Sequence, residues 1–291
     1  MKRIKNKNYD QTRTVYGAPE VDGKKKAKLI PLRQIMVDGN NPGYMNRVLV
    51  CTPTGTGSVR VEWVLARYGQ TIPMNWSMVQ YTQFMNSFIT YRYALPDAQN
   101  LIVQEAVRGG YEWLILIEDD NVLPPDAFVR WNKYMRDRTV PIVSGVYFSR
   151  SDPSEPMIFR GRGTSVYWDW KFGDKVWCDG VPTGSLLIHC SILKAMYDES
   201  PEYLINGTTT ARRVFDAPQK MWLDKEGHFN TLVGTTDLQW CTRIMDGNYF
   251  EKAGWPEYKD KKYPFLVDTG IFVKHIDRNT GEQFPKEESL T

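Results

Sequence analysis

The sequence predicts an α/β protein with a mostly parallel central sheet flanked by helices. Three observations predict this fold class: short, continuously apolar segments recur along the chain, amphipathic segments separate them, and the turns between them are short and contain Gly or Pro. Continuously apolar segments are typical of strands covered on both faces, as in a parallel sheet. The 291 residues are sufficient for one large domain of this kind.

The first expected strand is the apolar run 47–51, which ends at Thr52-Pro53. After a glycine-rich turn, we expect Ser58 to cap a helix, because a serine oxygen accepts hydrogen bonds from the free N–H groups of a helix start. A second strand is expected near residues 78–81. These elements begin the strand–helix–strand alternation of a parallel sheet.

The alternation continues through the most apolar part of the chain. We expect Asp97 to cap a helix that ends at Gly109-Gly110, since glycine commonly follows the last turn of a helix. The strand 111–117 follows, then a helix that begins after Pro124-Pro125, and then a strand over 141–147.

The second half is less regular. It contains an expected strand near 185–188, a helix near 191–197, a loop-rich stretch that extends to about Val233, and a helix over 237–245. The last expected strand covers 265–273. Its apolar run marks it as part of the same buried sheet.

The charge of the chain is concentrated at its start. The net charge is +3, whereas residues 1–33 contain ten basic and three acidic residues, a net of about +7. Two interpretations stay open: a solvated basic arm, or an arm that touches a polyanion such as nucleic acid or anionic lipid.

Targeting and cysteine patterns restrict the cellular setting. No apolar segment follows the charged start, and no run of 18 or more apolar residues occurs, so we expect neither a secretory signal nor a transmembrane segment. The cysteines form no Cys-x-x-Cys pair, which favours a reduced, cytoplasmic setting. They are Cys51, Cys178, Cys190 and Cys241.

Three acids follow the most apolar strand directly: Glu118, Asp119 and Asp120. Ligands of open α/β sheets bind beyond the carboxyl ends of the strands. Adjacent acids there repel one another unless a cation or hydrogen bonds compensate. Divalent cations such as Mg²⁺ and Mn²⁺ prefer oxygen ligands and often bind substrate phosphates. The alternative is an acidic lead-in to the next helix, whose N-terminus favours negative charge.

This segment resembles the DXD motif of GT-A glycosyltransferases: an apolar run, an acid, any residue, an acid, an apolar pair and Pro-Pro. Glu118 and Asp120 occupy the acidic places, with Glu118 in the place of the first Asp. The resemblance implies a GT-A type, Rossmann-like sheet. It also implies that Asp120, with Asp119 as the alternative ligand, binds a divalent metal, Mn²⁺ or Mg²⁺, which bridges the donor's diphosphate. The longer side chain of Glu118 is expected to bind the ribose or a metal-bound water, and we place both Glu118 and Asp119 at the nucleotide sugar.

Two further segments resemble the nucleotide-facing parts of these enzymes. Ala98-Gln99-Asn100 is similar to an Ala-Arg-Asn segment, with Gln99 in place of the Arg; the resemblance implies that Asn100 contacts the nucleotide. The strand that begins near Gly184 resembles one in which small residues let substrate approach the backbone. We also expect Thr52 and Pro53, at the end of the first strand, to contact the nucleotide. A helix start and a turn before a core strand are the structural alternatives.

Two late segments resemble the catalytic and metal-binding parts of the family. Thr236-Asp237 and the residues up to Arg243 resemble a Glu-Asp-x-x-Trp/Phe-x-x-Arg segment, in which the Asp is the base of inverting members. The strand that ends at His275 resembles one that ends in a metal-binding histidine. The resemblance therefore implies that Asp237 is the catalytic base and His275 a metal ligand. An Asp at a helix start and a satisfied histidine are the structural alternatives.

The resemblance covers roughly residues 46–276. It divides the chain into a basic N-terminal arm (1–45), a nucleotide-sugar-binding half (46–150), a loop-rich acceptor-binding and catalytic half (151–276) and a polar C-terminal tail (277–291). The loops 150–177 and 203–233 are expected to shape the acceptor site with their aromatic side chains. These aromatic residues are Tyr167, Trp168, Trp170, Trp177 and Trp222.

The implied function is a metal-dependent transfer of a sugar from a nucleoside-diphosphate sugar, UDP-sugar first among them, to an acceptor hydroxyl. A single base without a second carboxylate as nucleophile favours inversion. The acceptor is left open between a glycan, a protein and a modified nucleic acid, such as a modified base in viral DNA. Two alternatives remain: a nucleotidyltransferase, whose phosphate loop the stretch 55–60 faintly resembles, and a non-catalytic sugar-nucleotide-binding protein.

Overall fold

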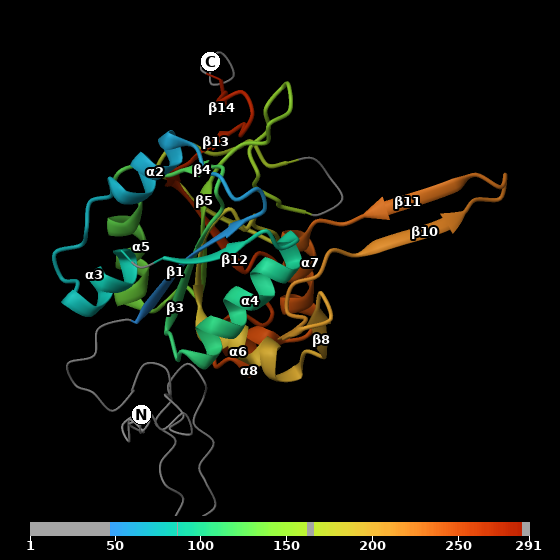
Figure 1. The fold of residues 1–291 in the computed structure, drawn as a ribbon, viewed down its shortest axis with the longest axis horizontal. Helices are drawn as coiled ribbons and strands as arrows, with labels where there is room; N and C mark the ends of the chain where they lie inside the picture. Colours follow the sequence, from blue (N-terminus) through green and yellow to red (C-terminus); the bar gives the residue numbers. More distant parts are fainter. Residues whose placement is uncertain (1–46, 86, 162–165, 287–291) are drawn as a thin grey trace, which may run out of the picture.

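The computed structural model describes residues 47–85, 87–161 and 166–286, so the basic arm expected at 1–45 lies outside the described residues. A seven-stranded sheet forms the centre, in the order β2-β1-β3-β7-β5-β12-β6 (Figure 1). Its strands are β1 (Val48–Thr54), β2 (Phe88–Tyr91), β3 (Trp113–Ile117), β5 (Ile142–Val146), β6 (Lys175–Cys178), β7 (Ser185–His189) and β12 (Phe265–Phe272). Five of them run in one direction, and β6 and β7 run against them. The expected mostly parallel sheet is confirmed.

Helices cover both faces of the sheet because successive side chains of a buried strand point to opposite faces. In β3, Leu114 and Leu116 pack into one apolar cluster and Trp113, Ile115 and Ile117 into the other. The first face is covered by α4 (Leu95–Arg108), α6 (Cys190–Glu199), α7 (Thr236–Asp246), α8 (Tyr249–Lys252) and the 3₁₀ turn Pro256–Tyr258. The second face is covered by α2 (Val61–Tyr68), α3 (Met78–Met85) and α5 (Ala127–Asp137).

The strand expected near 78–81 is wrong, because this segment is part of helix α3, and the edge strand of the sheet is β2. The helix start is fixed by a reciprocal pair. The Gln80 amide donates 3.3 Å to the Ser77 hydroxyl, while the Ser77 amide donates 3.0 Å to the Gln80 side chain. This capping box satisfies two free N–H groups. Phe84 then anchors the helix on Phe128, with ring centroids 4.9 Å apart.

Two expected caps are also wrong. Helix α2 begins after Arg60 without a side-chain cap, so Ser58 does not cap it. Helix α4 begins at Leu95, two residues before Asp97, with a proline in its first turn. Proline suits that position because its fixed φ is helical and its missing N–H would be unpaired there. Asp97 instead accepts a 2.7 Å hydrogen bond from the Tyr203 hydroxyl.

The stretch expected to be loop-rich forms two antiparallel hairpins. They are β8 (Glu202–Ile205) with β9 (Thr209–Arg212), and β10 (Gln219–Leu223) with β11 (Phe229–Val233). Asn206 and Gly207 both have positive φ, as tight hairpin turns require, which explains the first hairpin. The second projects far from the body of the protein (Figure 1).

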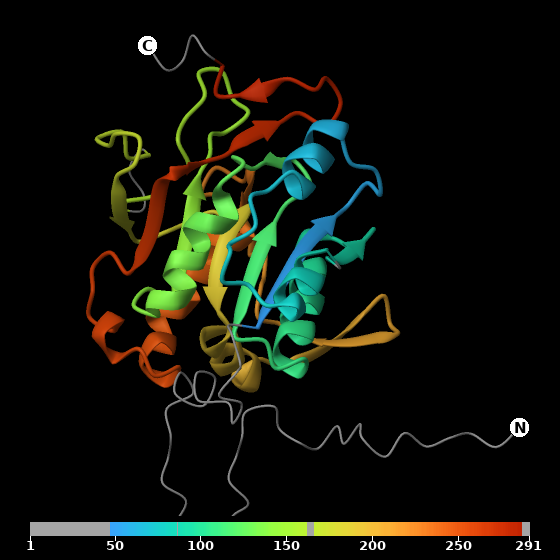
Figure 2. The ribbon, with the colours of Figure 1, turned by 90° about the vertical axis from the view of Figure 1, so that its left-hand side faces the viewer.

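The described part of the expected polar tail is folded. Strands β4 (Asn121–Val122), β13 (Lys274–Ile276) and β14 (Gln283–Phe284) form a small sheet in the order β14-β13-β4. Figure 2 shows the carboxyl ends of β1 and β3 pointing toward the red strands of this sheet. The C-terminal segment therefore lies at the edge where an α/β sheet binds its ligands.

Two further expectations concern the cysteines and the membrane. All four cysteines are free and buried. Within the described ranges, no helix is both long and apolar enough to cross a bilayer.

Candidate functional site

A cavity of about 610 Å³ opens at the carboxyl ends of β1, β3 and β5, beside the first turn of α7. Five residues expected in the site line it: Pro53, Glu118, Asp120, Asp237 and His275. They come from four separate parts of the chain, so only folding brings them together. The other four expected residues, Thr52, Asn100, Asp119 and Gly184, are not among the residues that line it.

The pairing of β13 with β4 places His275 beside Asp120. His275 is opposite Asn121 in this ladder, and the Ile276 amide donates 2.8 Å to the Asp120 carbonyl. The His275 Nε2 lies 3.5 Å from the Asp120 Oδ2, and its Nδ1 lies 2.9 Å from the Phe148 carbonyl. A carbonyl can only accept, so Nδ1 carries the hydrogen and Nε2 faces Asp120. Metal-binding histidines are oriented in this way.

Two arginines that no sequence pattern indicated also contact Asp120. The Arg150 Nη1 lies 3.6 Å from Oδ2 of Asp120, and the Arg278 Nη2 lies 3.2 Å from the same atom. Arg278 also binds the carboxylate of Asp119. Both arginines line the cavity. Three basic side chains therefore converge on one carboxylate oxygen.

These contacts determine the proton affinity of the acids. Burial tends to raise the pKa of Asp120, but His275, Arg278 and Arg150 outweigh it and hold this pKa below its ordinary value. Burial, reinforced by the nearby Asp120 and Asp237, raises the pKa of Glu118 to about 8. Glu118 also accepts a 3.2 Å hydrogen bond from the Thr183 hydroxyl. The adjacent acids are therefore in different environments, which a one-dimensional pattern does not reveal.

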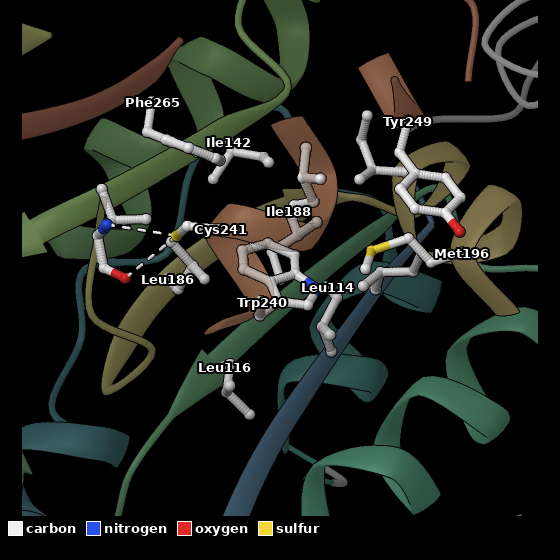
Figure 3. Close-up of a cluster of buried hydrophobic side chains, with 14 of the residues drawn as sticks. Leu114, Leu116, Ile142, Leu186, Ile188, Met196, Trp240, Cys241, Tyr249 and Phe265 are labelled. Atoms are coloured by element: carbon white, nitrogen blue, oxygen red, sulfur yellow. Dashed lines mark hydrogen bonds between the residues drawn. The ribbon is translucent and has the colours of Figure 1, made fainter. Parts of the chain in front are cut away.

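Asp237 also lines the cavity, in the first turn of α7, near enough to Glu118 to contribute to the raised pKa of that carboxyl group. One of its carboxylate oxygens accepts a 2.9 Å hydrogen bond from the Leu238 amide, and the helix start favours its negative charge. The following residues fix the helix in the core: Trp240 is fully buried and stacks on Phe215, and Cys241 exchanges hydrogen bonds with the backbone of Val181 (Figure 3). The helix that carries Asp237 is therefore fixed in the core.

Asn100 has a structural role in this structure. Its amide donates 3.0 Å to the Phe215 carbonyl, and its oxygen accepts from the amides of Val214 and Phe215 at 3.0 and 2.7 Å. These bonds join α4 to the segment that leads toward the second hairpin. Gln99 is also buried and donates 3.1 Å to Thr183, the residue that holds Glu118.

The remaining expected residues, Thr52, Asp119 and Gly184, pack against other parts of the protein next to the site. Thr52 is fully buried within β1, and Asp119 is buried against Arg278. A side chain at Gly184 would clash with the Asn121 amide and lie 2.6 Å from the Tyr147 hydroxyl. This glycine therefore lets protein side chains approach. Contact of these residues with a nucleotide stays a prediction.

The aromatic residues expected in the acceptor site do not line the cavity. Trp170 packs against the core beside Phe148, and Trp177 lies against Tyr258. On this side the cavity is lined instead by Met157, Ala217, Gly234 and Thr235. Ala217 and Gly234 flank the β10–β11 hairpin, so both ends of the hairpin lie at the cavity.

The pair Asp120 and His275 fits a hard divalent cation only in part. Ligands of one Mg²⁺ or Mn²⁺ lie about 2.1 Å from the ion and about 3 Å from one another. The 3.5 Å between Oδ2 and Nε2 is close to that spacing. No group of three or more His, Cys, Asp or Glu side chains among the described residues could hold a metal. Such an ion would therefore need oxygens from its substrate, as is usual for Mg²⁺.

Comparisons with known proteins give no family. No family model and no curated protein matches the chain. Among solved structures, it is similar to A197 from STIV, with 13% identity and a TM-score of 0.46 over 80% of this chain and 87% of that one. It is also similar to S. aureus TarS, with 10% identity and a TM-score of 0.35 over 53% of this chain and 30% of that one.

A third similar structure is an apo UDP-glucose pyrophosphorylase, with 10% identity and a TM-score of 0.35 over 79% of this chain and 76% of that one. The chain spans less than a third of the length of TarS. None of these similarities reaches a TM-score of 0.5, so we argue function from the cavity itself.

Proposed function

We propose that this protein is a metal-dependent glycosyltransferase that moves a sugar from a nucleoside-diphosphate sugar, UDP-sugar first among them, to an acceptor hydroxyl with inversion. One observation carries the proposal. A single cavity has a wall that suits a diphosphate, built from Asp120, His275 and two arginines, and a separate carboxylate, Asp237, on another element.

The balance of charge favours a metal ion. Asp120 and Asp237 line the cavity and Asp119 pairs with Arg278 beside it, so three carboxylates face two arginines. Glu118, whose pKa is raised to about 8, adds little negative charge near neutral pH. A diphosphate adds further negative charge, which the two guanidinium groups alone do not offset. Asp120 and His275 would hold the ion, and the ion would neutralise the departing diphosphate.

Asp237 is the proposed general base. It lines the cavity on the first turn of α7, where an acceptor hydroxyl can lose its proton to it. Besides Asp237 and the proposed metal ligand Asp120, one further carboxyl group lines the cavity, that of Glu118. It accepts a hydrogen bond from the Thr183 hydroxyl. With Asp237 as the base and no second carboxylate placed as a nucleophile among the described residues that line the cavity, a single displacement with inversion is favoured.

The acceptor is proposed to enter beside the β10–β11 hairpin, because Ala217, Gly234 and Thr235 at its base line the cavity near Asp237. The acceptor class is a glycan, a protein or a modified nucleic acid. Arg60 argues against the nucleotidyltransferase alternative, because it is the basic residue of the stretch 55–60 that resembles a phosphate loop. Its guanidinium pairs with Glu62 at 3.3 Å and donates to the Arg278 carbonyl, and it does not line the cavity.

The test is incubation of the full chain with UDP-, GDP-, CMP- and dTDP-sugars in the presence of Mn²⁺, with release of free nucleotide as the readout. Slow hydrolysis of one donor, accelerated by an acceptor, is the expected result. Release of pyrophosphate from a nucleoside triphosphate and a sugar 1-phosphate would instead identify a nucleotidyltransferase. Tight binding of a donor without any turnover would identify a sugar-nucleotide-binding protein.

A further inference from the structure

Arg150 and Arg278 reach the cavity from two unrelated elements. Arg150 follows β5 in the chain, and Arg278 follows β13. Their guanidinium groups meet at the Oδ2 atom of Asp120, at 3.6 and 3.2 Å. Both side chains remain partly open to the cavity, with 42% and 32% of their surfaces exposed. Two cations thus lie beside one another at an accessible surface.

The carboxylates leave most of the donors of these arginines unused. A guanidinium group has five N–H donors in a fixed plane. Arg150 contacts Asp120 through one nitrogen, Nη1, and Arg278 contacts Asp119 and Asp120 through one nitrogen, Nη2. The Nε of Arg278 is buried and has no hydrogen-bond partner among the described residues. The pair can therefore receive further acceptor oxygens without releasing the carboxylates.

The segments that carry both arginines are held by local hydrogen bonds. Asp277 accepts from the amides of Asn279 and Thr280, each at 2.8 Å, and Arg60 donates to the Arg278 carbonyl at 3.4 Å. After β5, the Ser154 hydroxyl donates 2.8 Å to the Ser149 carbonyl, next to Arg150. A binding group held in place by its surroundings loses less conformational entropy when it binds a ligand.

We propose that Arg150 and Arg278 form a diphosphate-binding pair that holds this group of the nucleotide even without a metal ion. The planar fork of a guanidinium matches two phosphate oxygens at once, and such charge-assisted bonds are about twice as strong as neutral ones. Asp119 and Asp120 act as counter-ions that hold the two arginines in the open cavity. The identity of the ligand as a diphosphate rests on the proposed function, and the position of the pair rests on the contacts above.

The test is calorimetric titration of inorganic pyrophosphate into the full chain in EDTA, at fixed ionic strength. The variants are Arg150→Gln and Arg278→Lys. The latter retains the charge, because complete removal would leave Asp119 buried without its cation and would destabilise the fold. Arg130→Gln is the matched control: Arg130 is 34% exposed, pairs with Asp126 at 2.7 Å, and lies outside the cavity lining.

The expected result is binding of pyrophosphate by the wild type and by Arg130→Gln. Each of the other two variants should weaken it by about tenfold, the loss of one charge-assisted hydrogen bond. Equal affinity in all four proteins, or no binding in EDTA at all, would overturn the proposal. Failure of the proposed function is distinguishable: pyrophosphate would then bind in an arginine-dependent way although no donor sugar is turned over.

Discussion

Replacement of Asp237 by asparagine removes the proposed base and keeps the structural role of this side chain. Asparagine has nearly the same shape, and its oxygen retains the 2.9 Å bond from the Leu238 amide. Trp240 and Cys241 continue to hold α7 in the core. The free energy of unfolding should therefore change by less than about 1 kcal/mol. Proton removal from the acceptor is lost, and general-base catalysis contributes about 10²- to 10⁴-fold, or roughly 2.7 to 5.5 kcal/mol.

The assay is nucleotide release at saturating donor and acceptor, together with donor binding in the presence of Mn²⁺. We expect kcat to fall by at least about 10²-fold, while donor affinity stays the same because the ion pairs of Arg150 and Arg278 are made with Asp119 and Asp120. Asp246→Asn, an exposed acid at the end of the same helix, is the control and should leave kcat unchanged. A decrease in kcat of less than about tenfold for Asp237→Asn would refute the assignment of the base.

Three further predictions test the framework around the site. Trp240→Ala should lower the free energy of unfolding by about 3 to 5 kcal/mol, because a fully buried indole is removed; a smaller loss in a urea titration would contradict its anchoring role. Gly184→Ala should cost about 1 to 3 kcal/mol, since its methyl group would displace the Asn121 and Tyr147 side chains; an unchanged melting temperature would rule out this close contact. Replacement of residues 219–233 by a short Gly-Ser link should leave donor hydrolysis intact and reduce transfer to the acceptor by at least about tenfold. Pro218 and Gly234 already share a 2.8 Å hydrogen bond, so the link closes without strain, and full transfer would exclude an acceptor role for the hairpin.

The strands and their carboxyl ends could be predicted from the sequence, since burial on both faces leaves a continuous apolar pattern. The segment ending in Glu118 to Asp120 is the clearest case: β3 is fully buried, and the acids follow at its carboxyl end. Helix α3 could not be predicted in the same way. Its short apolar run has no decisive period, and the informative signal was the Ser77–Gln80 capping box.

The second half of the site depends on pairings between distant residues. His275 and Arg278 approach Asp120 only because β13 pairs with β4, which joins segments about 150 residues apart. The resemblance to a family suggested His275, but no local pattern marks Arg278, which belonged to the expected polar tail. Arg150 could have been found, because it follows a strand end as Asp120 does. For Asn100, by contrast, the family resemblance implied contact with the nucleotide, whereas in the structure its side chain oxygen accepts hydrogen bonds from the backbone amides of Val214 and Phe215.

Asp120 and His275 are proposed to hold a divalent ion whose coordination is completed by the oxygens of a bound diphosphate. The most direct measurement is calorimetric titration of UDP in the presence of Mn²⁺ into the wild type and into Asp120→Ala, each repeated in EDTA. We expect Mn²⁺ to tighten UDP binding to the wild type by at least about tenfold and to have no such effect on the variant, whose metal ligand is gone. The same Mn²⁺-dependent gain in both proteins would contradict the assignment of the metal site.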